Sequence, residues 1–265
     1  MELLKRVIIS IIAIPGLLFL YYYGKTPLLA LFCLLSALSA YELYKMNHQK
    51  GNLIIFSVIP ITVLTTLFVG MFSAEWSLLL MLASLILISF EDVFKNKLEG
   101  SFDRLSASAF IMLYCGAAFG FAYKIHSLPN GNFLLPALAV LIWITDSFAY
   151  FTGMSLGKHR GFFKASPKKS IEGFIGGFLF CIAFALLAHY LWPKQIYLIF
   201  ALCLAFSAGL MGQYGDLLES IIKRHFSVKD SSNLIPGHGG ILDRFDSFIV
   251  AAPVFYIIIK FLLGS

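Results

Sequence analysis

Charged residues and paired cysteines are scarce in this sequence. Charged residues make up only 13% of the 265 residues and hydrophobic residues 59%, against about 25% and about 45–50% in an average soluble domain. This composition excludes a disordered chain and a long coiled coil. The four cysteines each stand alone in an apolar run without a C-x-x-C spacing, which excludes a disulfide scaffold and indicates small buried side chains. They are Cys33, Cys115, Cys181 and Cys203.

The sequence is instead rich in apolar runs near the length of about 20 residues that a helix needs to cross a bilayer. We therefore predict an all-α polytopic integral membrane protein with about nine transmembrane helices. The predicted spans are residues 7–23, 27–44, 53–72, 76–90, 105–123, 132–152, 171–192, 195–213 and 246–263. The fourth is short enough to be half inserted. The first lacks a small-residue cleavage site, so we interpret it as a span and not as a signal peptide.

Basic residues predict the orientation of these spans. With a cytoplasmic N-terminus, alternation places all but four of the 20 Lys and Arg residues on the cytoplasmic side, the exceptions being Lys25, Lys124, Lys194 and Lys260. Cytoplasmic loops are enriched in Lys and Arg, so we predict a cytoplasmic N-terminus and an external C-terminus. The net charge of +6 then reflects topology, and no nucleic-acid partner is expected.

The chain is predicted to have two parts. Residues 1–104 contain the first four spans, and residues 105–265 form a catalytic region with two long cytoplasmic segments, 153–170 and 214–245. Both segments are rich in Gly, Lys, Ser and Asp, so we expect function to reside there.

A polar stripe follows the eighth predicted span. Its members stand at positions i, i+3, i+4 and i+7, so they share one face of a helix. They are Asp216, Glu219, Ser220 and Lys223. The alternative interpretation is a helix end that emerges into water with ordinary i,i+4 pairs.

A glycine-rich loop around His238 precedes the last predicted span. Glycines let backbone N–H groups approach an anion, and the N-terminus of the following helix favours negative charge, so phosphate is the expected ligand. Asp243 and Asp246 then lie one turn apart at the start of an apolar helix, where carboxylates are costly unless they bind something. Carboxylates with phosphates suit Mg²⁺. The alternative is a flexible loop with an N-terminal Asp cap.

Asp146 interrupts the sixth predicted span near its cytoplasmic end. A lone charge in a span costs at least about 2.5–3.5 kcal/mol on the insertion scale, so it normally faces a cavity or a partner. We expect Asp146 to line the site, with Tyr150 on the same face. The alternative is an acid that reaches up to the membrane interface.

The first cytoplasmic segment carries a weaker signal. Ser166 and Pro167 suit a helix N-cap followed by Pro at the first helical position, which would present Lys168 and Lys169 from the first turn. The two lysines could bind phosphate, or they could be plain positive-inside anchors.

These segments resemble phosphatidate cytidylyltransferases, also called CDP-diacylglycerol synthases. The matching signature is Ser220-x-x-Lys223-Arg224-x4-Lys229-Asp230-x4-Ile235-Pro236-x-His238-Gly239-Gly240-x-x-Asp243-Arg244-x-Asp246. The segment Ser166-Pro167-Lys168-Lys169-Ser170-Ile171-Glu172-Gly173 is similar to the family's cytoplasmic segment before a transmembrane helix. Residues 1–104 match the family in hydropathy alone.

The resemblance implies Mg²⁺-dependent transfer of a cytidylyl group from CTP to phosphatidate on the cytoplasmic side of the cell inner membrane. It implies Asp216 and Asp243 as principal Mg²⁺ ligands, with Asp246 as a third ligand or support and a second cation left open. It implies Lys223, Arg224, Lys229 and Arg244 as phosphate clamps, with Lys223 and Arg244 counted among the catalytic residues. The further substrate-binding residues are Ser220, His238, Gly239, Gly240, Lys168, Lys169, Ser170 and Asp146. The expected partners are CTP, phosphatidate and the lipid bilayer, and a homodimer is left open.

Two other functions fit part of the pattern. A CTP-dependent lipid-alcohol kinase would use similar acids, lysines and glycines, but it would transfer the γ-phosphoryl group and need a base for the hydroxyl. A non-enzymatic polytopic transporter would carry ionisable residues through the middle of several spans, a pattern that only Asp146 fits, and no internal repeat is visible.

Overall fold

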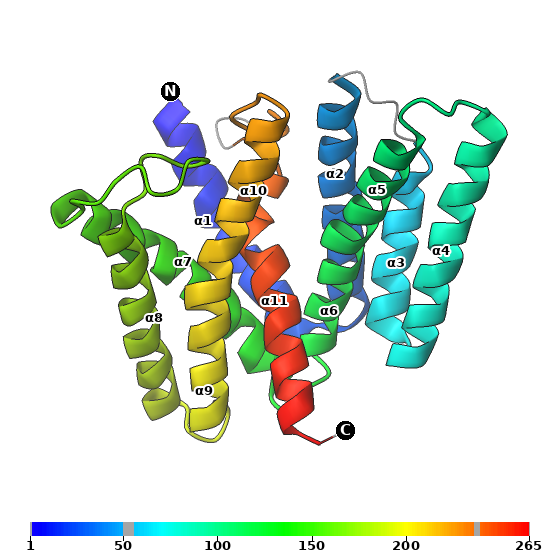
Figure 1. The fold of residues 1–265 in the computed structure, drawn as a ribbon. Helices are drawn as coiled ribbons and strands as arrows, with labels where there is room; N and C mark the ends of the chain where they lie inside the picture. The colour runs from blue at the N-terminus through cyan, green and yellow to red at the C-terminus, as the bar shows by residue number, and fades with distance from the viewer. Residues whose placement is uncertain (1, 50–55, 236–238, 265) are drawn as a thin grey trace.

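A computed structural model describes residues 2–49, 56–235 and 239–264 as a bundle of helices that run between two common ends (Figure 1). The elements are α1 (Glu2–Tyr23), α2 (Lys25–Gln49), α3 (Val58–Met71), α4 (Ala74–Lys95), α5 (Ser101–Ile111), the π-helical η1 (Met112–Ala117), α6 (Ala118–Ile125), α7 (Gly131–Ser155), α8 (Ile171–Leu191), α9 (Leu198–Leu204), the π-helical η2 (Ala205–Gly212), α10 (Gln213–His225) and α11 (Leu242–Leu262). These residues contain no strand, only two isolated bridges, between Arg160 and Ser170 and between Ile235 and Gly239. The predicted all-α fold is confirmed.

Among the described residues, seven helices are long and apolar enough to cross a membrane. They are Lys25–Gln49, Ala74–Lys95, Ser101–Ile125, Gly131–Ser155, Ile171–Leu191, Leu198–His225 and Leu242–Leu262. The chain is therefore a multi-pass membrane protein. The apolar helices Ala13–Tyr23 and Val58–Met71 are shorter, so the count of nine spans stays a prediction.

The third and fourth predicted spans differ from the helices that form. We expected the fourth to be the short one, but α4 has 22 residues and α3 has 14. The apolar pattern of the fourth ended before Asp92, yet the helix continues because Arg104 pairs with this buried carboxylate at 2.5 Å. Residues 53–55 of the third predicted span lie outside the described residues.

The eighth predicted span continues well beyond its expected end. Leu198–His225 is one helix of 28 residues, built from α9, η2 and α10. The predicted cytoplasmic segment 214–245 is therefore helical as far as His225, and the described residues between it and α11, 226–235 and 239–241, are loop. Gln213 closes the π-helical turn, donating to the Gly209 carbonyl at 2.6 Å and to the Phe174 carbonyl of α8 at 3.0 Å.

A buried aromatic cluster joins α1, α2, α6 and α11. The Tyr21 ring lies 5.7 Å from both Phe32 and Phe248, and the Phe32 ring lies 5.8 Å from Phe119. Such offset ring pairs add to the free energy of burial. Residues from both sides of position 104 thus share one core, and the division of the chain there stays a prediction.

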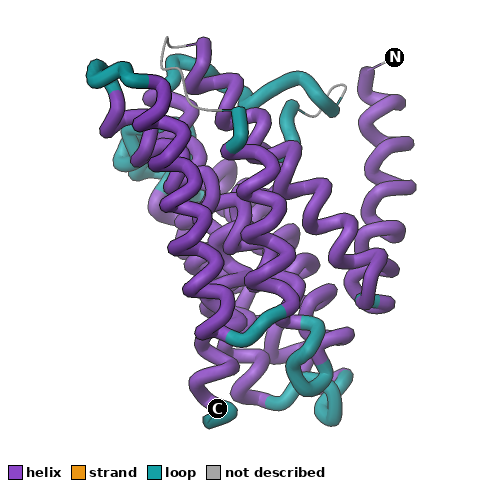
Figure 2. The backbone as a smooth tube through the Cα atoms, turned by 90° about the vertical axis from the view of Figure 1, so that its right-hand side faces the viewer, coloured by secondary structure: helices purple, strands orange, loops and turns teal. Residues whose placement is uncertain are grey.

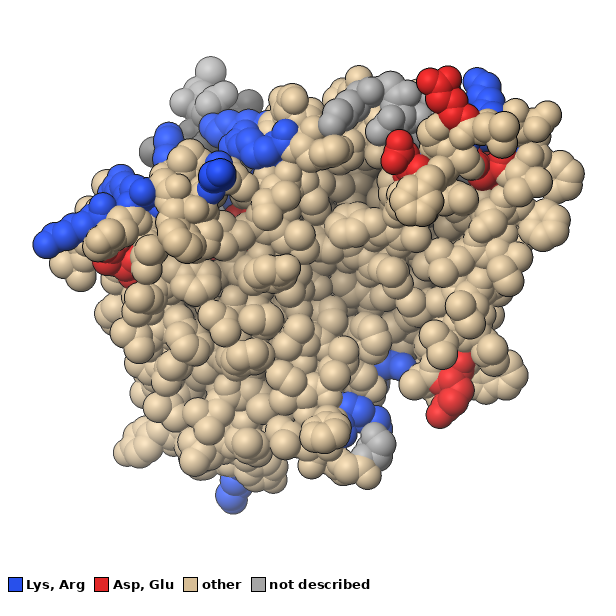
Figure 3. Space-filling view, viewed as in Figure 1, with Lys and Arg blue, Asp and Glu red and all other residues tan. Residues whose placement is uncertain are grey.

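The connections sort onto two ends of the bundle. The segments 96–100, 156–170, 226–235 and 239–241 lie at the end where α1 begins, whereas α11 ends at the opposite end (Figure 1). The view turned by 90° shows the same separation of the two ends of the chain (Figure 2). Lys and Arg gather mainly at the first end, with a tan band free of charge across the middle of this face (Figure 3). This arrangement matches the predicted topology, although the membrane side that each end faces stays a prediction.

Candidate active site

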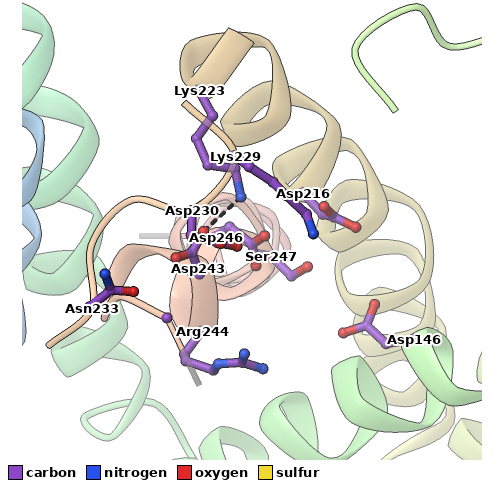
Figure 4. A pocket seen from close by; sticks show the side chains of 11 residues that line it. Asp146, Asp216, Lys223, Lys229, Asp230, Asn233, Asp243, Arg244, Asp246 and Ser247 are labelled. Carbon is purple, nitrogen blue, oxygen red and sulfur yellow. Dashed lines mark hydrogen bonds and ion pairs between the residues drawn. The ribbon is translucent and has the colours of Figure 1, made fainter. Parts of the chain in front are cut away.

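A polar cavity of about 570 Å³ lies between α7, α10, α11 and the loop 226–241. Figure 4 shows the side chains that converge on it. Its wall consists of Asp146, Asp216, Lys223, Lys229, Asp230, Asn233, Gly239, Asp243, Arg244, Asp246 and Ser247. Ionisable groups inside a membrane protein are costly, so they usually belong to a binding or catalytic site. The cluster of such groups at this end of the apolar bundle is therefore the candidate functional site.

Asp216 stands in the first turn of α10 and forms an ion pair with Lys169. Lys169 belongs to the segment before α8, so this pair joins the two predicted cytoplasmic segments. Arg224 adds one link further along α10, since its Nε donates to the Ala165 carbonyl at 3.3 Å, and its guanidinium also donates to the Val228 carbonyl just beyond the same helix at 3.1 Å. The segment 156–170 is therefore held against α10 beside the cavity.

Lys223 lies between two carboxylates. Its ammonium is 2.5 Å from a carboxylate oxygen of Glu219 and 2.7 Å from a carboxylate oxygen of Asp243. Glu219 is fully buried, and a buried carboxylate is strongly destabilising without its cation. Lys223 thus joins the stripe of α10 to the first turn of α11.

Asp243 fastens the loop to the start of α11. One oxygen accepts from the backbone N–H groups of Ser231 at 2.9 Å and Gly240 at 2.8 Å, and from the Ser231 hydroxyl at 2.9 Å. The loop can turn here because Gly239 has φ +82, a conformation that other residues rarely adopt. This geometry places the other Asp243 oxygen on Lys223.

Asp146, Asp216 and Asp246 bring three carboxylates to one cavity from three helices. Asp146 is exposed on α7, and the three act electrostatically on one another. Asp246 also accepts the backbone N–H of Ser247 at 2.6 Å. Like charges in a confined space repel one another, so this arrangement favours the binding of a cation.

The remaining predicted residues divide between the wall and its surroundings. Lys229, Gly239 and Arg244 are in the wall, whereas Ser220, Arg224, Gly240, Lys168, Lys169 and Ser170 lie outside it. The expected role of His238 falls outside the described residues. Tyr150 is exposed on α7 and does not line the cavity.

The predicted helix start at Ser166 is wrong. Ser166 and Lys169 form a turn, closed by a backbone hydrogen bond of 3.1 Å, and α8 begins at Ile171. The N-cap is Ser170, whose hydroxyl accepts from the Gly173 N–H at 3.1 Å. Ser170 has the extended backbone and the free N–H three residues later that a cap requires, so the two lysines precede the helix.

Sequence reasoning missed several residues of this site. Asp230, Asn233 and Ser247 line the cavity, and the place of Asp230 in the matching signature was the available signal for that residue. Glu42 lies behind the wall, where it contacts the loop and the start of α11. A carboxylate inside the second predicted span was the available signal, the same one that drew attention to Asp146.

The donor set fits a divalent cation whose coordination is completed by its substrate. Within the described part of the chain, no group of three or more His, Cys, Asp or Glu side chains is arranged to hold a metal by itself. Asp216 and Asp243 each carry a lysine instead. Mg²⁺ is usually held by one or two carboxylates together with phosphates and water. The carboxylates that line the cavity are sufficient to supply that number.

Comparison with known proteins shows which proteins this chain is similar to. A model of the cytidylyltransferase family matches residues 4–262. A phosphatidate cytidylyltransferase of Bacillus subtilis (strain 168) is 32% identical over 269 residues, covering 97% of this chain and 98% of the relative. Proteins of the same name from Staphylococcus haemolyticus (strain JCSC1435) and Staphylococcus aureus (strain COL) are 32% and 35% identical, each covering 96% of this chain and 98% of the relative.

Proposed function

The chain belongs to the cytidylyltransferase family, and on that premise we propose that it converts CTP and phosphatidate into CDP-diacylglycerol and pyrophosphate. A phosphate oxygen of phosphatidate attacks the α-phosphorus of CTP, a new P–O bond forms, and the bond to the β-phosphate breaks. Pyrophosphate leaves with that bonding pair. The enzyme is thus a nucleotidyltransferase of phospholipid biosynthesis.

The polar cavity among apolar helices is the observation that carries this proposal. Both substrates bear phosphates, and their mutual repulsion is the main obstacle to reaction. The cavity offers the cations Lys223, Lys229 and Arg244 in one wall. Basic side chains fixed around developing charge stabilise the transition state without a protein nucleophile.

Mg²⁺ is the proposed cofactor, held by Asp216, Asp243 and Asp246. Bound there together with the phosphates, Mg²⁺ would neutralise their negative charge and activate the α-phosphorus. Asp216 and Asp243 would hold the cation, and their ion-pair partners Lys169 and Lys223 are proposed to bind phosphate oxygens. Arg224, Lys168 and Ser220 stand just outside the wall and are proposed to guide substrate there.

The position of the cavity suits one water-soluble and one lipid substrate. It lies at the end of the bundle where α1 begins, beside the loops with most of the Lys and Arg residues. We assign this end to the cytoplasmic side of the inner membrane, because basic loops stay inside.

The experiment compares two lipid acceptors with the purified protein, CTP and Mg²⁺. With phosphatidate as acceptor, one pyrophosphate should be released per CTP consumed. With diacylglycerol as acceptor, no pyrophosphate should be released. Release of CDP with diacylglycerol would indicate the lipid-alcohol kinase, and no CTP consumption by the folded protein would contradict the proposed reaction.

A further inference from the structure

Glu42 of α2 is a fully buried carboxylate that contacts the catalytic segment some 200 positions later in the chain. One oxygen accepts from the Ser232 hydroxyl at 2.6 Å and from the Ile241 N–H at 2.9 Å. The other accepts from the Leu242 N–H at 2.8 Å and lies 3.0 Å from the Ser231 hydroxyl. Two oxygens with about four lone-pair sites accommodate three donors, because the Ser231 hydroxyl has one proton and donates it to Asp243.

The start of α11 has no cap of its own. Its N-cap residue is Ile241, whose side chain cannot accept a hydrogen bond, and the first N–H groups of a helix need acceptors from outside. Glu42 supplies one to Ile241 and one to Leu242. A negative charge at this position also interacts favourably with the positive end of the helix.

Gly240 gives independent support for this contact. A Cβ atom at Gly240 would lie 2.6 and 2.7 Å from the two carboxylate oxygens of Glu42 and 1.9 Å from the Ser231 hydroxyl. Only glycine leaves room for the carboxylate to reach the backbone. The glycine of the signature therefore accommodates Glu42.

Ser231 connects this contact to the cavity wall. Its hydroxyl lies within hydrogen-bond distance of both Glu42 and Asp243, at 3.0 and 2.9 Å, and its backbone N–H donates to Asp243. A shift of Glu42 would thus move Asp243, and with it Lys223. Misplacement by about 1 Å can cost 100-fold in rate.

We propose that Glu42 is a positioning residue for the transfer reaction, which fixes Ser231 and Ser232 to the start of α11 and thereby holds Asp243 in the cavity. This inference rests on the proposed function for its catalytic consequence, but the contact itself does not. It gives the N-terminal helices a part in the active site, although every residue assigned from the signature lies beyond position 140.

The test compares Glu42→Gln with Ser36→Ala in the full-length protein. Gln keeps the shape of the side chain, but its amide N–H₂ group faces donors and cannot accept their hydrogen bonds. We therefore expect kcat to fall about 10-fold to 100-fold and the half-saturating Mg²⁺ concentration to rise. Amide hydrogen exchange at Ile241 and Leu242 should accelerate about tenfold or more, with α8 unchanged. Ser36 is equally buried on α2 and accepts from Thr66 at 2.8 Å, so its variant should change none of these.

The outcomes separate this inference from the proposed function. An active wild type with normal kcat, Mg²⁺ dependence and exchange in Glu42→Gln would overturn the role of Glu42 alone. A wild type without transferase activity would overturn the function, and exchange would still test the contact. If Glu42→Gln does not fold, Glu42→Asp keeps the charge but shortens the side chain, and unaltered exchange at Ile241 and Leu242 in that variant would likewise contradict the proposal.

Discussion

Lys223 joins two carboxylates, and its removal leaves both without a cation. Replacing Lys223 with Met keeps much of the volume, yet Glu219 is fully buried, so we predict destabilisation by about 3–5 kcal/mol and loss of turnover. Thermal unfolding in detergent measures the first effect. Lys164→Met, at an exposed position of the segment before α8, is the control.

A double variant distinguishes the buried charge from lost packing. Glu219→Gln with Lys223→Met removes the uncompensated carboxylate, so it should unfold at a higher temperature than Lys223→Met alone. Equal stability of the single variant and the wild type would instead mean that the ion pairs contribute nothing to folding.

Asp216 tests the cation proposal at the residue scale. We predict that Asp216→Asn lowers turnover at least about 100-fold at all Mg²⁺ concentrations, because charge stabilisation by a bound metal is worth several kcal/mol. Formation of the cytidylylated lipid over a Mg²⁺ titration measures this. Asp103→Asn, an exposed carboxylate of α5, should behave as the wild type, and near-normal activity of Asp216→Asn would remove this residue from the site.

Sequence reasoning reached the residues of the site that share a motif or one helix face. Asp216 and Lys223 follow from helical spacing, and Asp243 and Asp246 from their place after the glycines. Glu42 could not be assigned, because its partners are distant in sequence and only the fold brings them together. The pairing of Asp216 with Lys169 was hidden for the same reason.

At the scale of elements, the start of α8 gives a direct contrast between sequence and structure. We predict that Ser170→Ala destabilises the protein by about 1 kcal/mol through loss of the N-cap, whereas Ser166→Ala has no such effect. Thermal unfolding of the two variants side by side measures the difference. The reverse order of stability would restore the helix start at Ser166.

The apolar pattern predicted most helices but not their limits. Runs of about 20 residues identify spans, whereas α4 continues past its apolar part because Asp92 pairs with Arg104. The helix α10 continues from η2 because Asp216 and Lys223 of its polar stripe line a cavity. The π-helical turns η1 and η2 have no signal in the hydropathy. Such limits depend on tertiary partners, which a local pattern does not contain.

At the scale of the whole molecule, the topology is open to chemical labelling. We predict that a membrane-impermeant maleimide labels Lys194→Cys in intact cells and Lys97→Cys only after permeabilisation, because the two loops lie at opposite ends of the bundle. Both positions are exposed. Both variants are made in a protein in which Cys33 is replaced by Ala, and that protein without an added cysteine is the matched control. Its remaining cysteines, Cys115, Cys181 and Cys203, are buried.

Labelling of both cysteines from the same side would contradict this topology. It would mean that the chain crosses the membrane an even number of times between the two loops. The change would then have to lie among the three helices between residues 97 and 194, which are Ser101–Ile125, Gly131–Ser155 and Ile171–Leu191.

The central claim is that the polar cavity transfers a cytidylyl group to a lipid phosphate. The most direct measurement supplies the purified protein with phosphatidate, Mg²⁺ and CTP labelled in parallel at the α- or the γ-phosphorus, and follows the label into the lipid phase. The account predicts that the α label alone enters the lipid. Entry of the γ label would contradict it in favour of a kinase, and entry of neither label with folded protein would contradict it in favour of a transporter.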